Sequence, residues 1–230
     1  MIDYDYVEQG DCLELMKDIP DGSIDLIVTD PPYRVTSRGS SGGTGGILKD
    51  ELNMKGKVFV HNNIDISDWI TEMYRVLKES SHCYIMTNNV NLYNYLTEIQ
   101  KTEFKIFKVL IWKKNNCITN QYYMDSHEYI IFCRKGKAKK INNCGTKSVL
   151  EVDNPKNKCH PTEKPIDLMQ TFILNSSNEG DIVLDPFMGS GSTCVAAVNT
   201  NRHYIGFELD EKYFQIACER LDEVEQVVTT

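Results

Sequence analysis

Short apolar segments alternate with helix-like segments along this chain, and this alternation constrains the fold more than any other feature. Six apolar runs bounded by turn residues are predicted to form strands, at residues 25–29, 82–87, 108–112, 128–133, 181–184 and 203–207. Several runs are apolar throughout, as expected of strands that are covered on both faces. Apolar stripes at helical spacing lie between them, at Ile70–Met73–Leu77, Ile166–Met169–Ile173 and Phe214–Ala217–Leu221. The sequence therefore predicts an α/β fold with a mostly parallel sheet and helices on both sides.

Two residues indicate where helices begin. Ser67 is a possible N-cap for the first stripe, because a serine side chain can accept a hydrogen bond from a free backbone N–H of the first turn. Pro165 is suited to the first turn of the second helix, where its missing N–H costs nothing.

The composition is that of a single globular domain. The 230 residues are 41% hydrophobic and 25% charged, which is enough to build a core without a disulfide or a metal. No apolar run approaches the ~20 residues of a membrane helix, and the acidic start MIDYDYVEQGD lacks a signal pattern, so a cytoplasmic location is expected. The eight cysteines form no CxxC pair, so we expect reduced thiols and no metal site.

Charge is unevenly distributed along the chain. The net charge is −8, yet residues 101–164 hold 14 Lys and Arg against 6 Asp and Glu. Such an asymmetry indicates either a face for an anionic partner or a solvated lysine-rich surface, and charge alone does not separate the two. Two segments lack periodicity: a Gly- and Ser-rich loop at 34–63, and a Lys- and Asn-rich segment at 135–159.

A glycine turn follows the predicted strand at 181–184. In Asp-Pro-Phe-Met-Gly-Ser-Gly-Ser, Gly189 and Gly191 allow a ligand to approach the backbone closely before a helix begins near Ser192. Asp185 ends this strand and Glu208 ends the next, where a carboxylate can bind the hydroxyls of a ribose. The loop fits S-adenosylmethionine (SAM), a dinucleotide or a purely structural turn. Cys194 disfavours the dinucleotide, because that fingerprint needs Gly or Ala there.

The segment Thr29-Asp-Pro-Pro-Tyr33 directly follows the first predicted strand. Two prolines remove two N–H donors, so the carbonyl groups and the Asp30 carboxylate form a cradle that only accepts hydrogen bonds. A planar group with an NH2 suits this cradle, and its ring can stack on Tyr33. Accepting both amine hydrogens frees the nitrogen lone pair for attack on a methyl sulfonium held ~3–3.5 Å away. The alternative is a strand-ending turn without a ligand.

At these residues the chain resembles the amino-group DNA methyltransferases, which methylate adenine at N6 or cytosine at N4. The order, with the DPPY segment before the glycine loop, resembles the β group of that family. The resemblance implies a Rossmann-like SAM-dependent methyltransferase fold with seven strands, one of them antiparallel. It also implies SAM as cofactor, DNA as partner, rotation of the target base out of the duplex, and a possible homodimer.

The resemblance also implies residue roles. Gly10-Asp11-Cys12 and His160-Pro-Thr-Glu-Lys-Pro165 match family segments of the cofactor pocket. Asp11 would bind the adenine amine of SAM, Thr162 and Lys164 its methionine carboxylate, and Glu208 its ribose. The expected catalytic residues are Asp30, Pro31, Pro32 and Tyr33. The expected SAM-binding residues are Asp11, Cys12, Asp30, His160, Thr162, Lys164, Asp185, Pro186, Phe187, Gly189, Ser190, Gly191, Ser192, Glu208 and Leu209.

The lysine-rich segment is short for target recognition, so we expect it to grip phosphates and to share this work with the 34–63 loop. The candidate DNA-binding residues are Arg34, Arg38, Lys113, Lys114, Lys137, Lys139 and Lys140. DPPY favours adenine N6 as the target, since SPPY is commoner in cytosine-N4 enzymes. The alternatives are a cytosine-N4 enzyme, an RNA or protein amide methyltransferase, a nicotinamide oxidoreductase and a catalytically silent DNA-binding module.

Overall fold

The computed structural model describes residues 2–32, 64–118, 123–156 and 163–228. The strands are β1 (Tyr6–Gln9), β2 (Ile24–Thr29), β3 (Leu77–Thr87), β4 (Lys105–Ile118), β5 (Asp125–Arg134), β6 (Val149–Glu151), β7 (Ile182–Asp185) and β8 (His203–Glu208). The helices are α1 (Cys12–Leu15), α2 (Ile66–Val76), α3 (Leu92–Gln100), α4 (Ile166–Ser176), α5 (Ser192–Val198) and α6 (Glu211–Val228), with a 3₁₀ turn η1 (Met16–Asp18). All six predicted strands and all three predicted helices are therefore present.

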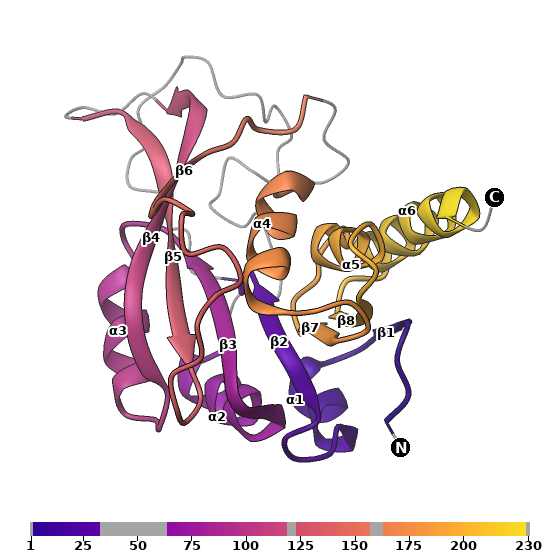
Figure 1. Ribbon diagram of the computed structural model, residues 1–230. Coiled ribbons are helices and arrows are strands. Elements are labelled where there is room, and N and C mark those ends of the chain that lie inside the picture. Colours follow the sequence, from indigo (N-terminus) through magenta and orange to yellow (C-terminus); the bar gives the residue numbers. More distant parts are fainter. Residues whose placement is uncertain (1, 33–63, 119–122, 157–162, 229–230) are drawn as a thin grey trace.

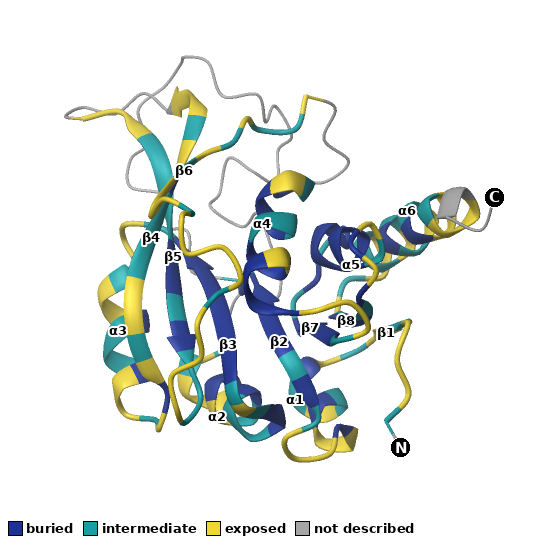
Figure 2. Ribbon diagram, in the orientation of Figure 1, coloured by how far each residue is buried: buried dark blue, intermediate teal, exposed yellow. Residues whose placement is uncertain are grey.

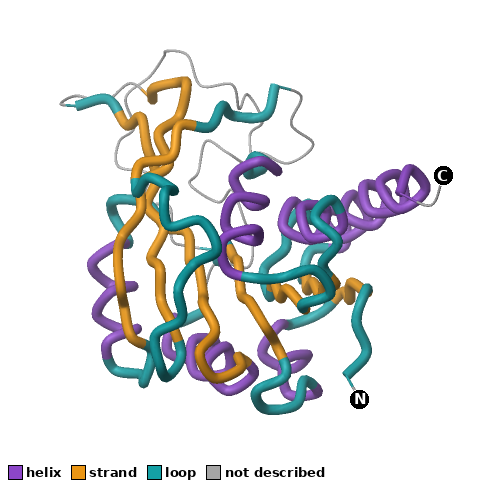
Figure 3. Tube along the Cα trace, viewed as in Figure 1, coloured by secondary structure: helices purple, strands orange, loops and turns teal. Residues whose placement is uncertain are grey.

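The strands form one sheet in the order β1-β8-β7-β2-β3-β5-β4-β6 (Figures 1 and 3). Neighbouring strands are parallel except at β5, which runs antiparallel to both β3 and β4. The single antiparallel strand agrees with the prediction, whereas the predicted number of seven strands is wrong. The eighth strand is β6, three residues of the lysine-rich segment that pair with β4 at the edge of the sheet.

Alternation along each strand divides the core into two layers. The strands β2 and β7 at the centre of the sheet are buried along almost their whole length (Figure 2). In β2, Ile27 faces a cluster built on α1, α2 and α3, whereas Leu26 and Val28 face a cluster built on α4, α5 and α6. Trp69 at the first layer and Phe172 at the second are almost completely buried. At about 25 cal/mol per Å² of apolar surface, burial on both faces is the main stabilisation of this sheet.

Helix boundaries differ slightly from the predicted ones. Asp65, not Ser67, is the N-cap of α2, and Ser67 lies in the first turn instead. Pro165 is the N-cap of α4, one position before the predicted first turn. Leu77 ends the apolar stripe of α2 but already belongs to β3, because its extended backbone stops the helix. Within the described residues, no helix is both long and apolar enough to span a bilayer.

Candidate active site at the carboxyl edge of the sheet

Four neighbouring parallel strands end at one edge of the sheet, and each ends at or just before a residue of the predicted site segments. The strands β1, β8, β7 and β2 are neighbours in the sheet (Figure 1). Their order places Gly10, Glu208, Asp185 and Asp30 side by side at their carboxyl ends. Ligands in open α/β sheets bind at this edge. The segment that begins at Thr29 and the glycine turn after Asp185 are separated by more than 150 residues in the sequence, yet they share one rim.

A buried hydrogen bond joins the two segments directly. The Thr29 hydroxyl donates to Asp185 Oδ1 over 2.7 Å, and the backbone N–H of Phe187 donates to the same oxygen over 3.1 Å. Burial raises the pKa of Asp185 to about 6, although the hydroxyls of Thr193 and Thr29 oppose the shift. Asp185 thus connects the end of β2 to the glycine turn.

The glycine turn adopts backbone conformations that favour glycine. Gly189 has φ +54° and Gly191 has φ +79°, both in the left-handed region. A Cβ at Gly189 would meet nothing within 4 Å, so the turn leaves open space there, whereas one at Gly191 would lie 3.1 Å from Ala217 Cβ. The turn is therefore backed by α6 at Gly191 and open at Gly189.

Glu208 is tied to the same turn. Its Oε2 accepts the backbone N–H of Gly189 over 2.9 Å, and its Oε1 accepts that of Asp210 over 2.8 Å. Burial raises the pKa of this carboxyl group. Each oxygen keeps further capacity to accept a hydrogen bond, as binding of a ribose hydroxyl would require.

Two site serines are held by an arginine that the sequence reading missed. Arg220 of α6 donates to the Ser190 carbonyl over 2.6 Å and to its hydroxyl over 2.9 Å. Its guanidinium also lies 3.1 Å from Glu163 Oε1 and 3.4 Å from the Ser192 hydroxyl. The apolar stripe of α6 predicts the helix, but it carries no signal for this contact.

The N-terminal segment reaches the rim through β1. The N–H of Gly10 donates to the Glu208 carbonyl over 2.9 Å. The exposed Asp11 caps α1 by accepting the N–H of Leu13 over 2.9 Å. Cys12 is buried, and burial raises the pKa of its thiol to about 12, so it is an apolar wall rather than a reactive group.

Asp30 lies in a buried, charged environment. Lys164 Nζ contacts Asp30 Oδ2, whereas Oδ1 is buried and has no hydrogen-bond partner among the described residues. Burial raises the pKa of Asp30, and Lys164 partly opposes this effect. Lys164, expected to hold a methionine carboxylate, thus pairs with the Asp30 carboxylate in this structure.

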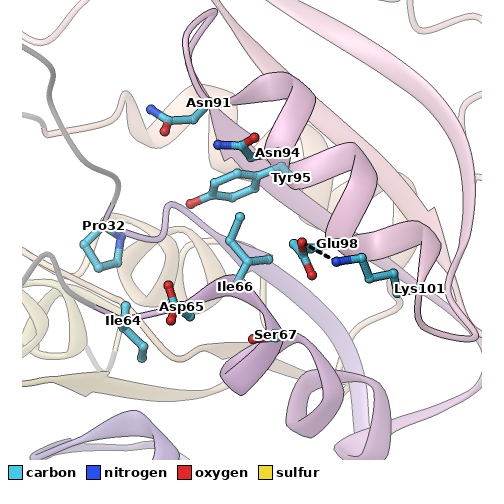
Figure 4. Close-up of a pocket in the computed structure, with 10 residues that line it drawn as sticks. All are labelled: Pro32, Ile64, Asp65, Ile66, Ser67, Asn91, Asn94, Tyr95, Glu98 and Lys101. Atoms are coloured by element: carbon cyan, nitrogen blue, oxygen red, sulfur yellow. Dashed lines mark hydrogen bonds and ion pairs between the residues drawn. The ribbon is translucent and has the colours of Figure 1, made fainter.

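A polar cavity of about 620 Å³ opens next to Pro32, between the beginnings of α2 and α3 (Figure 4). Its lining includes Asp65, Asn94 and Tyr95, and Glu98 pairs with Lys101 at its far side. Asp30 is not among the lining residues. The cavity therefore adjoins the Asp30 corner without forming it.

The remaining predicted SAM-binding residues lie at the glycine turn or, for Leu209, directly after β8. Pro186 is buried, Phe187 packs edge-on against Trp69 with ring centroids 5.5 Å apart, and Leu209 is 43% exposed. Pro31 is buried beside Asp30. Predictions at Tyr33, Arg34, Arg38, His160 and Thr162, and the 34–63 loop, lie outside the described residues.

The predicted DNA-binding lysines are divided between the two ends of the sheet. Lys113 is exposed on β4 and lies 3.1 Å from Glu151, whereas Lys114 is largely buried against Glu128. Lys137, Lys139 and Lys140 follow the end of β5, where Arg134 pairs with Lys105, the first residue of β4. The antiparallel direction of β5 places that end at the amino side of the sheet. The structure therefore separates these three lysines from the candidate site.

Comparisons with known proteins identify the family of this chain. The N6/N4 methyltransferase family, described as DNA methylase, matches residues 24–219. The type II methyltransferase M.HinfI of Haemophilus influenzae is 32% identical over 245 aligned positions, which cover 94% of this chain and 68% of that protein.

Two solved structures share the fold. The M1.HpyAVI–SAM complex has a TM-score of 0.72 at 27% identity, covering 93% of this chain and 98% of the other. The cytosine-N4-specific PvuII DNA methyltransferase has a TM-score of 0.74 at 18% identity over 100% and 93% of the two chains, a likeness of fold alone. These likenesses confirm the predicted Rossmann-like methyltransferase fold. The family match and the similarity to M.HinfI show that the chain belongs to the N6/N4 DNA methylase family.

Proposed function

We propose that this DNA methylase transfers the methyl group of SAM to the N6 amino group of an adenine rotated out of duplex DNA. The observation that carries the proposal is the position of Asp30. It lies on the same rim as Asp185 and Glu208, and its buried Oδ1 has no partner among the described residues. A buried acceptor without a donor is costly unless a ligand supplies the donor.

The carboxylates of the rim suit a cationic cofactor with a ribose. SAM supplies, when bound, a methyl group on a positively charged sulfur. Asp185 and Glu208 accept hydrogen bonds only from hydroxyl and backbone N–H donors, and no described cation forms an ion pair with either. Glu208 would hold the ribose, and the open space at Gly189 admits a ligand close to the backbone.

The target amine would be held by the Asp30 corner. Asp30 Oδ1 and the Pro31 carbonyl would accept the two hydrogens of the amine, and Tyr33 would stack on the base. As the amine nitrogen gains the methyl group and the bond from that methyl to the SAM sulfur breaks, the nitrogen must lose one proton, which Asp30 Oδ1 would accept. Because a duplex hides this amine, the target nucleotide must leave the base stack to reach the corner.

Adenine is the proposed target because the corner reads DPPY. The test is incubation of the purified protein with labelled SAM and with mixed-sequence DNA, RNA and protein in competition, followed by nucleoside analysis of the labelled DNA. We expect N6-methyladenine. N4-methylcytosine as the sole product would overturn the choice of base while leaving the amino-methyltransferase chemistry intact. Label in RNA or protein rather than DNA would overturn the proposed substrate.

We also propose a role in restriction-modification, because M.HinfI is named a type II methyltransferase. The corner precedes the glycine turn in the chain, which is the order of the β group. The check is sequencing of DNA from an expressing host: methylation confined to one short site, and resistance of that site to a restriction enzyme, are the expected results. We also propose a homodimer, for which light scattering should give the mass of two chains.

A further inference from the structure

Four charged side chains of alternating sign, all largely buried, run from the Asp30 corner into the sheet. Lys164 Nζ contacts Asp30 Oδ2 and lies 3.6 Å from Glu128 Oε2, and Lys114 Nζ contacts Glu128 Oε1. The four side chains are only 6–20% exposed. Two positive and two negative charges balance, which is the condition for burying such groups at a tolerable cost.

The antiparallel direction of β5 brings these charges together. β5 begins where the parallel strands end, so Glu128 near its beginning lies at the edge that carries Asp30. Trp112 of β4 lies directly opposite Glu128, and Lys114 follows two residues later on the same face.

Trp112 fixes the Lys114 end of this series of four charges. Lys114 Nζ lies 4.9 Å from the centroid of the Trp112 ring. The buried indole donates its N–H to the Val152 carbonyl over 2.8 Å, which ties β4 to the segment after β6. A cation over a desolvated indole face is stabilised, so Lys114 is held from two sides.

We propose that Glu128 and Lys114 are positioning residues for Asp30. Lys114 holds Glu128, Glu128 holds Lys164, and Lys164 occupies Asp30 Oδ2, so that Oδ1 is the oxygen left for the target amine. This inference rests on the proposed function, in which Asp30 contacts the amine. Glu128 and Lys114 act only through Lys164 and touch neither the base nor SAM.

The electrostatic effects on Asp30 have opposite signs within the series. Burial raises the pKa of Asp30, Lys164 and Lys114 lower it, and Glu128 raises it. The other carboxylate facing this corner is Asp185 of β7, whose own pKa is raised by Asp30. Replacing Glu128 by Gln removes its negative charge but keeps an oxygen that can face Lys164, so the pKa of Asp30 should fall, whereas removing the positive charge of Lys114 should raise it.

The test compares Glu128→Gln with Lys114→Met in steady-state kinetics as a function of pH. We expect kcat to fall on the order of 10- to 100-fold in each, as for a displaced reacting group, with the Kd for SAM unchanged in calorimetry. Since an ionised Asp30 is needed, the acid limb of kcat should move to lower pH in Glu128→Gln and to higher pH in Lys114→Met.

A matched control is Lys78→Met, which removes a lysine from the 2.7 Å ion pair with Asp25 near the other end of β2. It should leave both kcat and the acid limb unchanged. If a single variant fails to fold, the double variant Lys114→Met/Glu128→Gln keeps the charges balanced. Its acid limb should stay near that of the unmodified protein while kcat remains low.

The positioning role would be overturned if the acid limbs of kcat in Glu128→Gln and Lys114→Met moved in the same direction, or did not move. Carbon-13 NMR titration of the Asp30 carboxyl in the variants tests the series without turnover. The two opposite pKa shifts are expected there even if the DNA substrate is wrong. Failure of the unmodified protein to methylate DNA would instead overturn the proposed function, so the two failures are distinguishable.

Discussion

The two halves of the rim hold their carboxylates by different means. On the β7–β8 side, Asp185 and Glu208 accept hydrogen bonds from the Thr29 hydroxyl and from backbone N–H groups, and none of the described cations pairs with them. On the β2–β5 side, Asp30 and Glu128 are paired with lysines. Neutral donors orient a carboxylate without cancelling its charge, whereas a lysine cancels it.

This difference matches the two ligands that we propose. SAM carries a positive sulfonium, so a half that keeps uncompensated negative charge attracts it. Adenine is neutral, and its amine needs a well-placed acceptor rather than a strong field. A charge-balanced corner supplies that acceptor, because Lys164 engages one Asp30 oxygen and leaves the other free.

The largest expected effect tests the Asp30 side. Asp30→Ala removes the acceptor for the amine, so kcat should fall on the order of 10³-fold, while calorimetry should give a nearly unchanged Kd for SAM. Asp30→Asn keeps one acceptor oxygen and should retain an intermediate rate. Rates near those of the unmodified protein in Asp30→Ala would contradict the mechanism.

The second largest effect is expected for SAM binding on the β7–β8 side of the rim. Glu208→Ala removes the carboxylate proposed to bind the ribose, so the Kd for SAM should rise about 10- to 100-fold, the usual loss for a hydrogen bond to a charged group. At saturating SAM, kcat should change much less. Glu208→Gln, which keeps one acceptor oxygen, is the control and should bind SAM with intermediate affinity. An unchanged calorimetric Kd would refute the ribose role.

Asp185 should show that negative charge on this side reduces stability. Its pKa of about 6 lies above that of an unfolded Asp, so the folded protein binds the extra proton between about pH 4 and 6 and loses stability as pH rises through this range. Asp185→Asn should therefore raise the free energy of unfolding on the order of 2 kcal/mol at pH 7 and have little effect below pH 4. Urea unfolding at both pH values measures this. A variant less stable than the unmodified protein at pH 7 would contradict it.

The smallest effect concerns the hydroxyl that joins the two halves. Thr29→Val deletes the 2.7 Å hydrogen bond to Asp185, so the free energy of unfolding should fall by about 1 kcal/mol and the pKa of Asp185 should rise further. Thr29→Ser keeps the hydroxyl and serves as the control. Equal stability of the serine and valine variants would show that the bond has no such role.

Local patterns in the sequence predicted much of this protein. Apolar runs and helical stripes located six of the strands and three of the helices, because burial on both faces leaves a continuous apolar run, but the stripe of α3 was overlooked. The short strands β1 and β6 were missed. Tyr6–Gln9 and Val149–Glu151 are too short, and too exposed, to carry a periodic signal.

The candidate site was predicted in part for the same reason. Asp30, Asp185 and Glu208 each follow or end a recognisable strand, so the sequence placed them at one edge. It also grouped Lys137 with Lys113 as phosphate contacts. Only the direction of β5 shows that Lys137 begins a segment at the opposite end.

The sequence by itself determined the layered α/β fold, the place of Asp30, Asp185 and Glu208 at the ends of strands, and the chemistry of these acceptors, because each depends on residues close together in the chain. The tertiary structure alone decided that Lys164 contacts Asp30, 134 positions away, and that Arg220 holds Ser190. Such partners depend on strand order and direction. Hydrophobic periodicity records which face of a strand is buried, but it does not record which strand lies beside it.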